Sequence, residues 1–195
     1  MTSLAAVPDQ EITKDDVLSQ LAEQREAGEI IRLNRQEIAT LLAKHYDECE
    51  LRIDSAEIYL QKCIVTGVWH IPEGDNMPDS ISGHHPNGSN CVKGTDQIEA
   101  VQQASFLFMI AKWGELAPLA GEIRSAVFNT LLQPGDTAAI NIQITDINDK
   151  PSRKNVTGSG EISKQGGKTK PSTVSLTGDA MLPKMFARMQ QRFCD

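Results

Sequence analysis

Three helix-start signatures near the beginning of the chain constrain its fold more than any other feature. In each, a side chain that accepts a hydrogen bond from backbone N–H is followed three residues later by an acid: Thr13 with Asp16, Asn34 with Glu37, and Asp54 with Glu57. Such pairs satisfy backbone N–H groups that have no partner at the start of a helix. Because an apolar-periodic run and a break follow each pair, the pattern predicts three successive helices.

These helices are predicted together with three short strands. The first helix runs from residue 14 to a stop at Gly28, and residues 30–33 form a strand. The second places Ile38, Leu41 and Leu42 on one face. The third spans residues 55–66, and residues 68–71 leave it as a strand. A loop of residues 72–90, rich in Gly, Pro and Asn, leads to a return strand at residues 91–92.

This order of elements resembles a winged helix-turn-helix domain over residues 13–93, after a flexible arm of residues 1–12. Residues 35–42 look like the second helix of such a fold, and residues 60–69 like a recognition helix entering its wing. Residues 45–53 depart from the family pattern, because they make the link between the second and third helices longer than the tight turn usual in such folds. The resemblance implies nucleic-acid contacts at Gln61 and Lys62. A plain helical bundle is the competing interpretation.

Residues 94–149 hold the most apolar part of the chain. Helices are predicted over residues 96–113 and 119–132, and residues 138–147 alternate isoleucine with polar side chains, as a strand with one wet face does. The two helices form either an oligomerisation layer or the core of a monomer, since periodicity does not separate the two. The predicted fold class is therefore mainly α with a few short β-strands (α+β): a winged-helix-like unit, a helical layer, one isolated strand and a flexible basic tail.

The charge is divided unevenly along the chain. Residues 1–149 carry 10 basic and 23 acidic side chains, whereas residues 150–195 carry 9 basic and 3 acidic ones. Residues 150–180 read as a basic, flexible linker of small polar residues. Five basic side chains there are candidates for contact with a phosphate backbone: Arg153, Lys154, Lys164, Lys168 and Lys170. A linker that carries lysine only for solubility is the alternative.

The last segment, residues 181–195, is predicted to form a short amphipathic helix. Met185, Met189 and Phe193 share one side, and Arg188 and Arg192 lie on another. Met and Phe beside basic residues suit a helix that docks in the groove of a partner protein. The same pattern suits a tail that packs on the acidic body of its own chain.

Metal binding and catalysis find little support. Cys63, His70, His84 and Cys91 supply zinc-ligand types, but they lack the close pairs of a zinc motif. We therefore expect no cofactor, with zinc at these four residues as the weak alternative. No nucleophile stands in a familiar catalytic context, so the chain is expected not to be an enzyme.

Two functions remain open. The first is an oligomeric nucleic-acid accessory or regulatory protein of phage or plasmid type, with its basic tail on DNA, similar in plan to phage small terminase subunits. The second is a structural or adaptor protein that binds protein partners through its acidic head and its Met/Phe tail helix. The sequence shows no membrane-length apolar run and no signal peptide, so a cytoplasmic protein without a membrane partner is expected.

Overall fold

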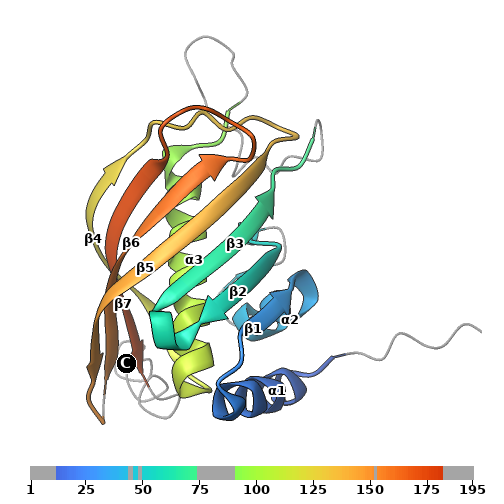
Figure 1. Ribbon diagram of the computed structural model, residues 1–195, viewed down its shortest axis with the longest axis vertical. Coiled ribbons are helices and arrows are strands. Elements are labelled where there is room, and N and C mark those ends of the chain that lie inside the picture. Colours follow the sequence, from blue (N-terminus) through green and yellow to red (C-terminus); the bar gives the residue numbers. More distant parts are fainter. Residues whose placement is uncertain (1–11, 44–45, 48–49, 74–90, 152, 182–195) are drawn as a thin grey trace, which may run out of the picture.

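A curved antiparallel sheet is wrapped around one long helix (Figure 1). The computed structural model describes residues 12–43, 46–47, 50–73, 91–151 and 153–181. The elements are α1 (Lys14–Ala27), β1 (Ile31–Asn34), α2 (Arg35–Leu42), β2 (Ser55–Tyr59), the 3-10 turn η2 (Leu60–Lys62), β3 (Ile64–His70), α3 (Gly94–Trp113), β4 (Ala117–Val127), β5 (Thr137–Asp149), β6 (Lys154–Lys164) and β7 (Ser172–Met181).

The strand order in the sheet is β1-β2-β3-β5-β6-β7-β4, and every neighbouring pair is antiparallel. The strands on either side of α3 in the chain, β3 and β4, are therefore separated in the sheet by β5, β6 and β7. Inward side chains alternate with outward ones, as Ile140 and Ile142 do on β5. This inner face and α3 enclose the core, while α1 and α2 pack beside β1.

Helix α3 lies very close to the sheet. A methyl group at Gly160 of β6 would sit 2.5 Å from Cγ1 of Val101, and one at Gly178 of β7 would sit 3.1 Å from the sulfur of Met109. These glycines leave the space that the helix occupies. Val101, Phe108 and Met109 are consequently almost fully buried.

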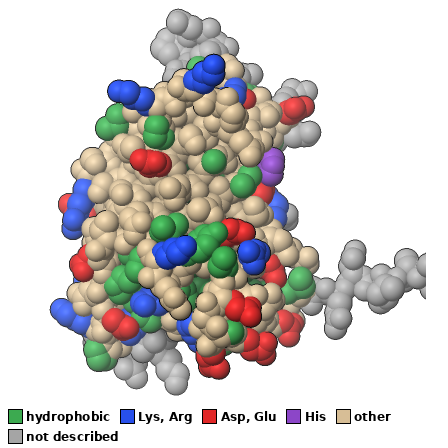
Figure 2. Space-filling model, viewed as in Figure 1, with side chains coloured by type: hydrophobic (Ala, Val, Ile, Leu, Met, Phe, Trp, Pro, Cys, Tyr) green, Lys and Arg blue, Asp and Glu red, His purple; other side chains and the backbone are tan. Residues whose placement is uncertain are grey.

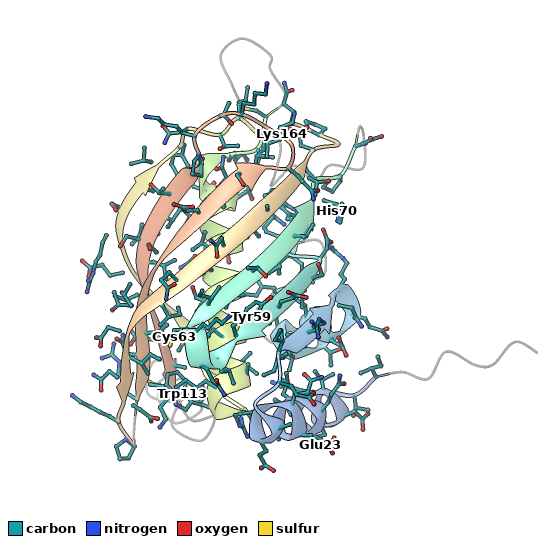
Figure 3. All side chains as sticks on the ribbon, viewed as in Figure 1. Glu23, Tyr59, Cys63, His70, Trp113 and Lys164 are labelled. Atoms are coloured by element: carbon teal, nitrogen blue, oxygen red, sulfur yellow. The ribbon has the colours of Figure 1, made fainter. Side chains whose placement is uncertain are left out.

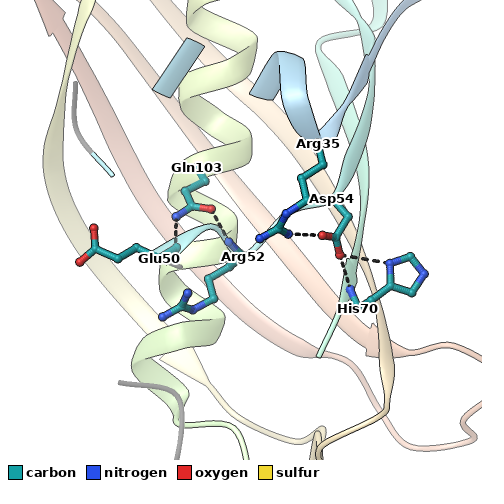
Figure 4. A network of polar contacts seen from close by, with 6 residues as sticks. All are labelled: Arg35, Glu50, Arg52, Asp54, His70 and Gln103. Atoms are coloured by element: carbon teal, nitrogen blue, oxygen red, sulfur yellow. Dashed lines mark hydrogen bonds and ion pairs between the residues drawn. The ribbon is translucent and has the colours of Figure 1, made fainter. Parts of the chain in front are cut away.

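One side of α3 is polar and faces the segment that precedes β2. Asp96, Glu99 and Gln103 lie on this side, because residues three or four apart on a helix are neighbours. Asp96 forms an ion pair with Arg52, and Glu99 forms a hydrogen bond with Tyr46. The amide of Gln103 bonds the backbone of Glu50 and Arg52, as Figure 4 shows. Polar contacts thus fasten this segment to the helix.

The predicted fold class, mainly α with a winged-helix-like unit, is wrong. The described residues hold seven strands and three α-helices in one sheet-based unit. Residues 55–66, the predicted third helix, form β2, η2 and the start of β3. Asp54 does not cap a helix, because its carboxylate accepts a hydrogen bond from the backbone N–H of His70 and pairs with Arg35. The predicted recognition helix is therefore a hairpin.

Two further expectations are corrected. Residues 119–132 contain strand β4 in place of a second apolar helix, and residues 150–180, expected to be a flexible basic tail, contain β6 and β7. The strand of residues 138–147 is not isolated, since β5 pairs with β3 and β6. The predictions of α1, β1, α2 and the apolar helix α3 are confirmed, including the capping boxes at Thr13 and Asn34.

Candidate anion-binding pocket

A pocket of about 430 Å³ lies where the end of α1, the turn η2 and the end of α3 meet. Figure 3 labels Tyr59 beside this turn and Trp113 at the end of α3, and Figure 2 shows basic side chains bordering apolar ones on the lower half of the same face. The lining residues come from these three elements, from the connection between α1 and β1, and from the last residue of β2: Arg25, Gly28, Glu29, Ile30, Tyr59, Leu60, Gln61, Lys62 and Lys112.

Gly28 ends α1 and shapes one wall of the pocket. It adopts a left-handed backbone conformation with φ of 69°, and its N–H bonds the carbonyl of Arg25 at 3.1 Å. Glycine adopts this conformation without the strain of a side chain. A methyl group at this position would sit 3.3 Å from Nε2 of Gln61. The absent side chain therefore allows the α1–β1 connection to approach η2.

Arg25 ties the ends of two helices together. Its Nη1 donates to the carbonyl of Ala111 at 3.2 Å and to that of Lys112 at 3.5 Å. These carbonyls lie in the last turn of α3, where the helix dipole favours a positive charge. The contact holds Arg25 and the backbone of Lys112 together at the pocket.

Two lysines supply further positive charge. The Nζ atom of Lys62 lies 5.4 Å from the ring centre of Tyr59, and that of Lys112 lies 5.9 Å from the ring of Trp113. Among the described residues, neither ammonium lies within salt-bridge distance of a carboxylate, although the charge of Lys112 helps to lower the pKa of the nearby Asp149. With Arg25 they make three cations around a pocket that holds one carboxylate, Glu29. The pocket is locally positive in a chain whose net charge is −7.

Tyr59 forms a neutral wall. Its hydroxyl donates to Oε2 of Glu57 at 2.6 Å, and this hydrogen bond raises the pKa of Tyr59. Glu57 also accepts from Nε of Arg32 at 3.0 Å, and the hydrogen bonds from Tyr59 and Arg32 lower the pKa of Glu57. The phenol therefore stays protonated at neutral pH, and its aromatic ring can contact a ligand.

The lining is suited to binding. Its described members include no serine, cysteine or histidine. The cations, the Tyr59 ring and the apolar side chains of Ile30 and Leu60 together fit an anion that carries an apolar or planar group.

A second polar cluster lies at the other end of the β2–β3 hairpin (Figure 4). Nδ1 of His70 lies 3.1 Å from Oδ2 of Asp54, which also pairs with Arg35. The His70 side chain is 67% exposed, and no described nucleophile contacts it. The cluster joins the end of β3 to the start of α2, so it stabilises the hairpin.

The predicted nucleic-acid contacts fall in two places. Gln61 and Lys62 line the basic pocket, although on a turn and not on a recognition helix. Three of the predicted tail contacts are engaged in ion pairs: Arg153 with Asp179, Lys154 with Asp149, and Lys164 with Asp136. Lys168 and Lys170 are exposed in the connection between β6 and β7. The five tail residues therefore belong to strands and their connections.

The weak zinc candidates are separated along the fold. Cys63 lies in the turn after η2, His70 ends β3, and Cys91 is buried before α3. His84 and the docking residues Met185, Met189, Phe193, Arg188 and Arg192 lie outside the described residues. Within the described ranges, no group of three or more His, Cys, Asp or Glu side chains is placed to hold a metal ion.

Sequence reasoning missed Arg25, Tyr59 and Lys112 as pocket residues. The Gly28 stop was the one local signal, because it marks where the chain turns. Arg25 and Lys112 are 87 positions apart, and only the packing of α1 on α3 brings them together. No pattern in the sequence links them.

Comparisons with known proteins do not indicate a function, so the pocket is the main guide to it. No protein-family model matches the chain. No curated protein matches it either. In the part of the chain that the structure describes, no helix has both the length and the apolar character needed to cross a bilayer.

Proposed function

We propose that this protein binds a small organic anion, carrying a phosphate or a carboxylate, in the pocket between α1, η2 and α3. The observation that carries the proposal is the set of three cations, Arg25, Lys62 and Lys112, around a pocket with one carboxylate. The volume of about 430 Å³ lies within the range of small-molecule sites. In this proposal the protein acts as a binding module.

The shape of the pocket favours an anion with an apolar or planar part. The two ammonium groups act as point charges, which bind phosphate or carboxylate oxygens without a fixed orientation. Ile30, Leu60 and the Tyr59 ring provide contact surface for the remainder of the ligand. Charge would thus supply attraction, and the apolar wall would supply selectivity.

DNA contact through the basic tail receives less support from the geometry. Arg153, Lys154 and Lys164 already pair with carboxylates. A long polyanion would also meet the field of the whole acidic chain, whereas a small anion meets mainly the charges within about 8–10 Å of it. The pocket therefore favours a small anion over a nucleic-acid backbone.

The test is calorimetric titration of the full chain with phenyl phosphate, benzoate and a short single-stranded DNA. The pocket variant is K62Q/K112Q. The control is K168Q/K170Q, which removes the same charge from two exposed lysines outside the pocket. We expect binding of phenyl phosphate or benzoate that weakens at least about tenfold in the pocket variant and is unchanged in the control.

Three results would contradict the proposal. They are the absence of binding by both small anions, equal weakening in the two variants, and DNA affinity that depends on Lys168 and Lys170 without any small-anion binding. The last result would return the basic tail to the centre of the function.

A further inference from the structure

One lysine of the anion pocket ends a series of side-chain contacts that runs along β2. The ammonium of Lys62 lies 5.4 Å from the ring centre of Tyr59. The hydroxyl of Tyr59 donates to Glu57 at 2.6 Å, and Glu57 also accepts from Arg32. The order of this series is thus a lysine, an aromatic ring, a carboxylate and a second cation.

The other lysine ends a series with the same order. The ammonium of Lys112 lies 5.9 Å from the ring centre of Trp113. Nε1 of Trp113 donates to Oδ2 of Asp149 at 2.9 Å, and Oδ1 of Asp149 accepts from the ammonium of Lys154. Figure 3 labels the two rings, Tyr59 beside the turn η2 and Trp113 at the end of α3. The same arrangement therefore occurs twice, on different elements, at one pocket.

The carboxylate of the second series is neutralised by its own cation. Asp149 and Lys154 stand opposite each other in the register of β5 and β6. Hydrogen bonds from Lys154 and Trp113 lower the pKa of Asp149, so at neutral pH it is ionised and accepts from the indole. Lys154 also lies 5.8 Å from the Trp113 ring. The ring is therefore fixed in place without an unpaired negative charge beside the pocket.

A lysine gains more from such support than an arginine would. Its ammonium is a point charge on a flexible four-carbon stem, and ordering that stem on binding costs free energy. A tryptophan ring is the best aromatic partner for an ammonium and attracts it within about 6 Å. Arg25 holds the backbone carbonyl of Lys112 at 3.5 Å, and the Trp113 ring restricts the side chain. Backbone and ammonium of Lys112 are thus both held at the end of α3.

We infer that Trp113 is a positioning residue of the anion pocket, which holds the ammonium of Lys112 where the anion binds, as Tyr59 holds that of Lys62. Trp113 does not line the pocket, so its influence on the anion passes through Lys112. Asp149 in turn fixes the indole through its hydrogen bond to Nε1. The inference rests on the proposed function and names a residue outside the lining that sets the affinity of that site.

The test is calorimetric titration of the full chain with phenyl phosphate and with benzoate. W113L removes the ring, and we expect the affinity to fall about two- to fivefold, the effect of one exposed cation–π contact. In the K112Q background, W113L has no further effect, because the ammonium is already absent. In the matched K62Q background, W113L keeps its full effect, because Lys62 lies over the other ring.

A second variant separates the ring from its hydrogen bond. W113F keeps an aromatic face for Lys112 but has no N–H for Asp149, so the affinity falls less than in W113L. Proton–nitrogen spectra of the ligand-free protein test the contact itself. The indole N–H signal of Trp113, assigned by its loss in W113F, shifts in K112Q and stays in place in K62Q. The buried Trp69 supplies the reference signal.

Three outcomes would overturn the inference and leave the proposed function intact, provided that the wild type binds either anion. They are an unchanged affinity in W113L, an equal further loss from W113L in the K112Q and K62Q backgrounds, and a Trp113 signal that ignores K112Q. An equal loss would mean that Trp113 acts through the fold and not through Lys112. If the wild type binds neither anion, the proposed function fails first, and this inference fails with it.

Discussion

Gln103 pairs with the backbone of Arg52. Its Oε1 accepts from the N–H of Arg52 at 2.7 Å, while its Nε2 donates to the carbonyl of Glu50 at 2.9 Å. Gln103 has no exposed surface. One buried amide on α3 therefore satisfies two backbone groups of the segment that precedes β2, and it holds this segment against the helix.

Replacing the Gln103 amide should lower the stability of the fold. Q103L leaves the N–H of Arg52 and the carbonyl of Glu50 without partners, and we expect the free energy of unfolding to fall by about 2–4 kcal/mol. Urea denaturation followed by circular dichroism measures the change. Q165L, at an exposed position, is the control and should alter stability by less than about 0.5 kcal/mol. Equal losses in both variants would refute a special role for Gln103.

Substitutions of Arg52 and Asp96, which form a buried ion pair, should change the free energy of unfolding non-additively. Their atoms lie 3.1 Å apart, with side chains only 4% and 8% exposed, and burial raises the pKa of Asp96 despite the nearby Arg52. R52L leaves a buried carboxyl without its partner and should cost about 3–5 kcal/mol. The double variant R52L/D96L removes both charges, so it should be more stable than R52L. A double-mutant cycle in urea tests this, and additive losses would contradict it.

Asp179 should make stability depend on pH. Burial acts to raise its pKa, but hydrogen bonds from Arg153 (2.9 and 2.7 Å) and Asn155 (2.8 Å) outweigh burial and lower it below the ordinary 3.8. A lowered native pKa stabilises the fold above the unfolded pKa, and this stabilisation is lost as the pH falls through the native value.

We therefore expect D179N to cost about 1 kcal/mol at pH 7, a figure reduced for the exposure of Arg153. The difference from the wild type should shrink as the pH falls below 3.8. Thermal unfolding across a pH series measures it, with E161Q as the exposed-carboxylate control. A D179N deficit that is constant from pH 7 to pH 3 would contradict the assignment.

Gly28 and Gly166 form a matched pair for separating backbone strain from contact. Their φ values are 69° and 73°, but a methyl group meets Gln61 at 3.3 Å in the first case and open space in the second. G166A should lose about 1 kcal/mol from its left-handed backbone alone. G28A should lose at least as much and should also weaken ligand binding in the pocket. If G28A and G166A bind the ligand equally, Gly28 does not shape the site.

The close approach of α3 to β6 yields a further prediction. G160A places a methyl group 2.5 Å from Cγ1 of Val101 and should destabilise the fold by about 1–3 kcal/mol. V101A makes room for that methyl group, so the double variant should lose less than the sum of the single losses. S159A, on the exposed side of the same strand, is the control. Chemical denaturation of the four variants measures these losses. If the losses of G160A and V101A simply add in the double variant, the two positions do not touch.

Local signals made part of the fold predictable. The capping boxes at Thr13 and Asn34 act over three residues, so the sequence shows them directly. The alternating isoleucines of β5 likewise reveal one buried and one wet face. In both cases the contacts that decide the structure are close in the chain or repeat with a fixed period.

The other elements depend on contacts between residues far apart in the chain, which the sequence pattern does not show. Asp54 has the local pattern of a helix cap, but its partners are Arg35 and His70, 19 and 16 positions away. β6 looked like a linker because Gly158 and Gly160 stand at inward positions where an apolar side chain is usual. The glycines serve close packing, which no composition argument distinguishes from flexibility.

The pocket escaped prediction for the same reason. Gln61 and Lys62 were expected to contact nucleic acid from a helix, and the structure places them in a turn beside Arg25 and Lys112. The sequence marked two suitable side chains but not their neighbours, since the neighbours come from the ends of two helices far apart in the chain.

The insertion of β5, β6 and β7 between the two strands that flank α3 has a kinetic consequence. Strand β4 gains its only described strand partner when β7 is in place, although β7 begins 45 residues after the end of β4. Closing such long loops costs entropy before any contact compensates for it, so proteins with this connectivity fold slowly. On the ribosome, β4 would emerge well before its partner and would wait with its apolar side chains exposed. This makes β4 the segment that a chaperone or a premature encounter with another chain would meet first.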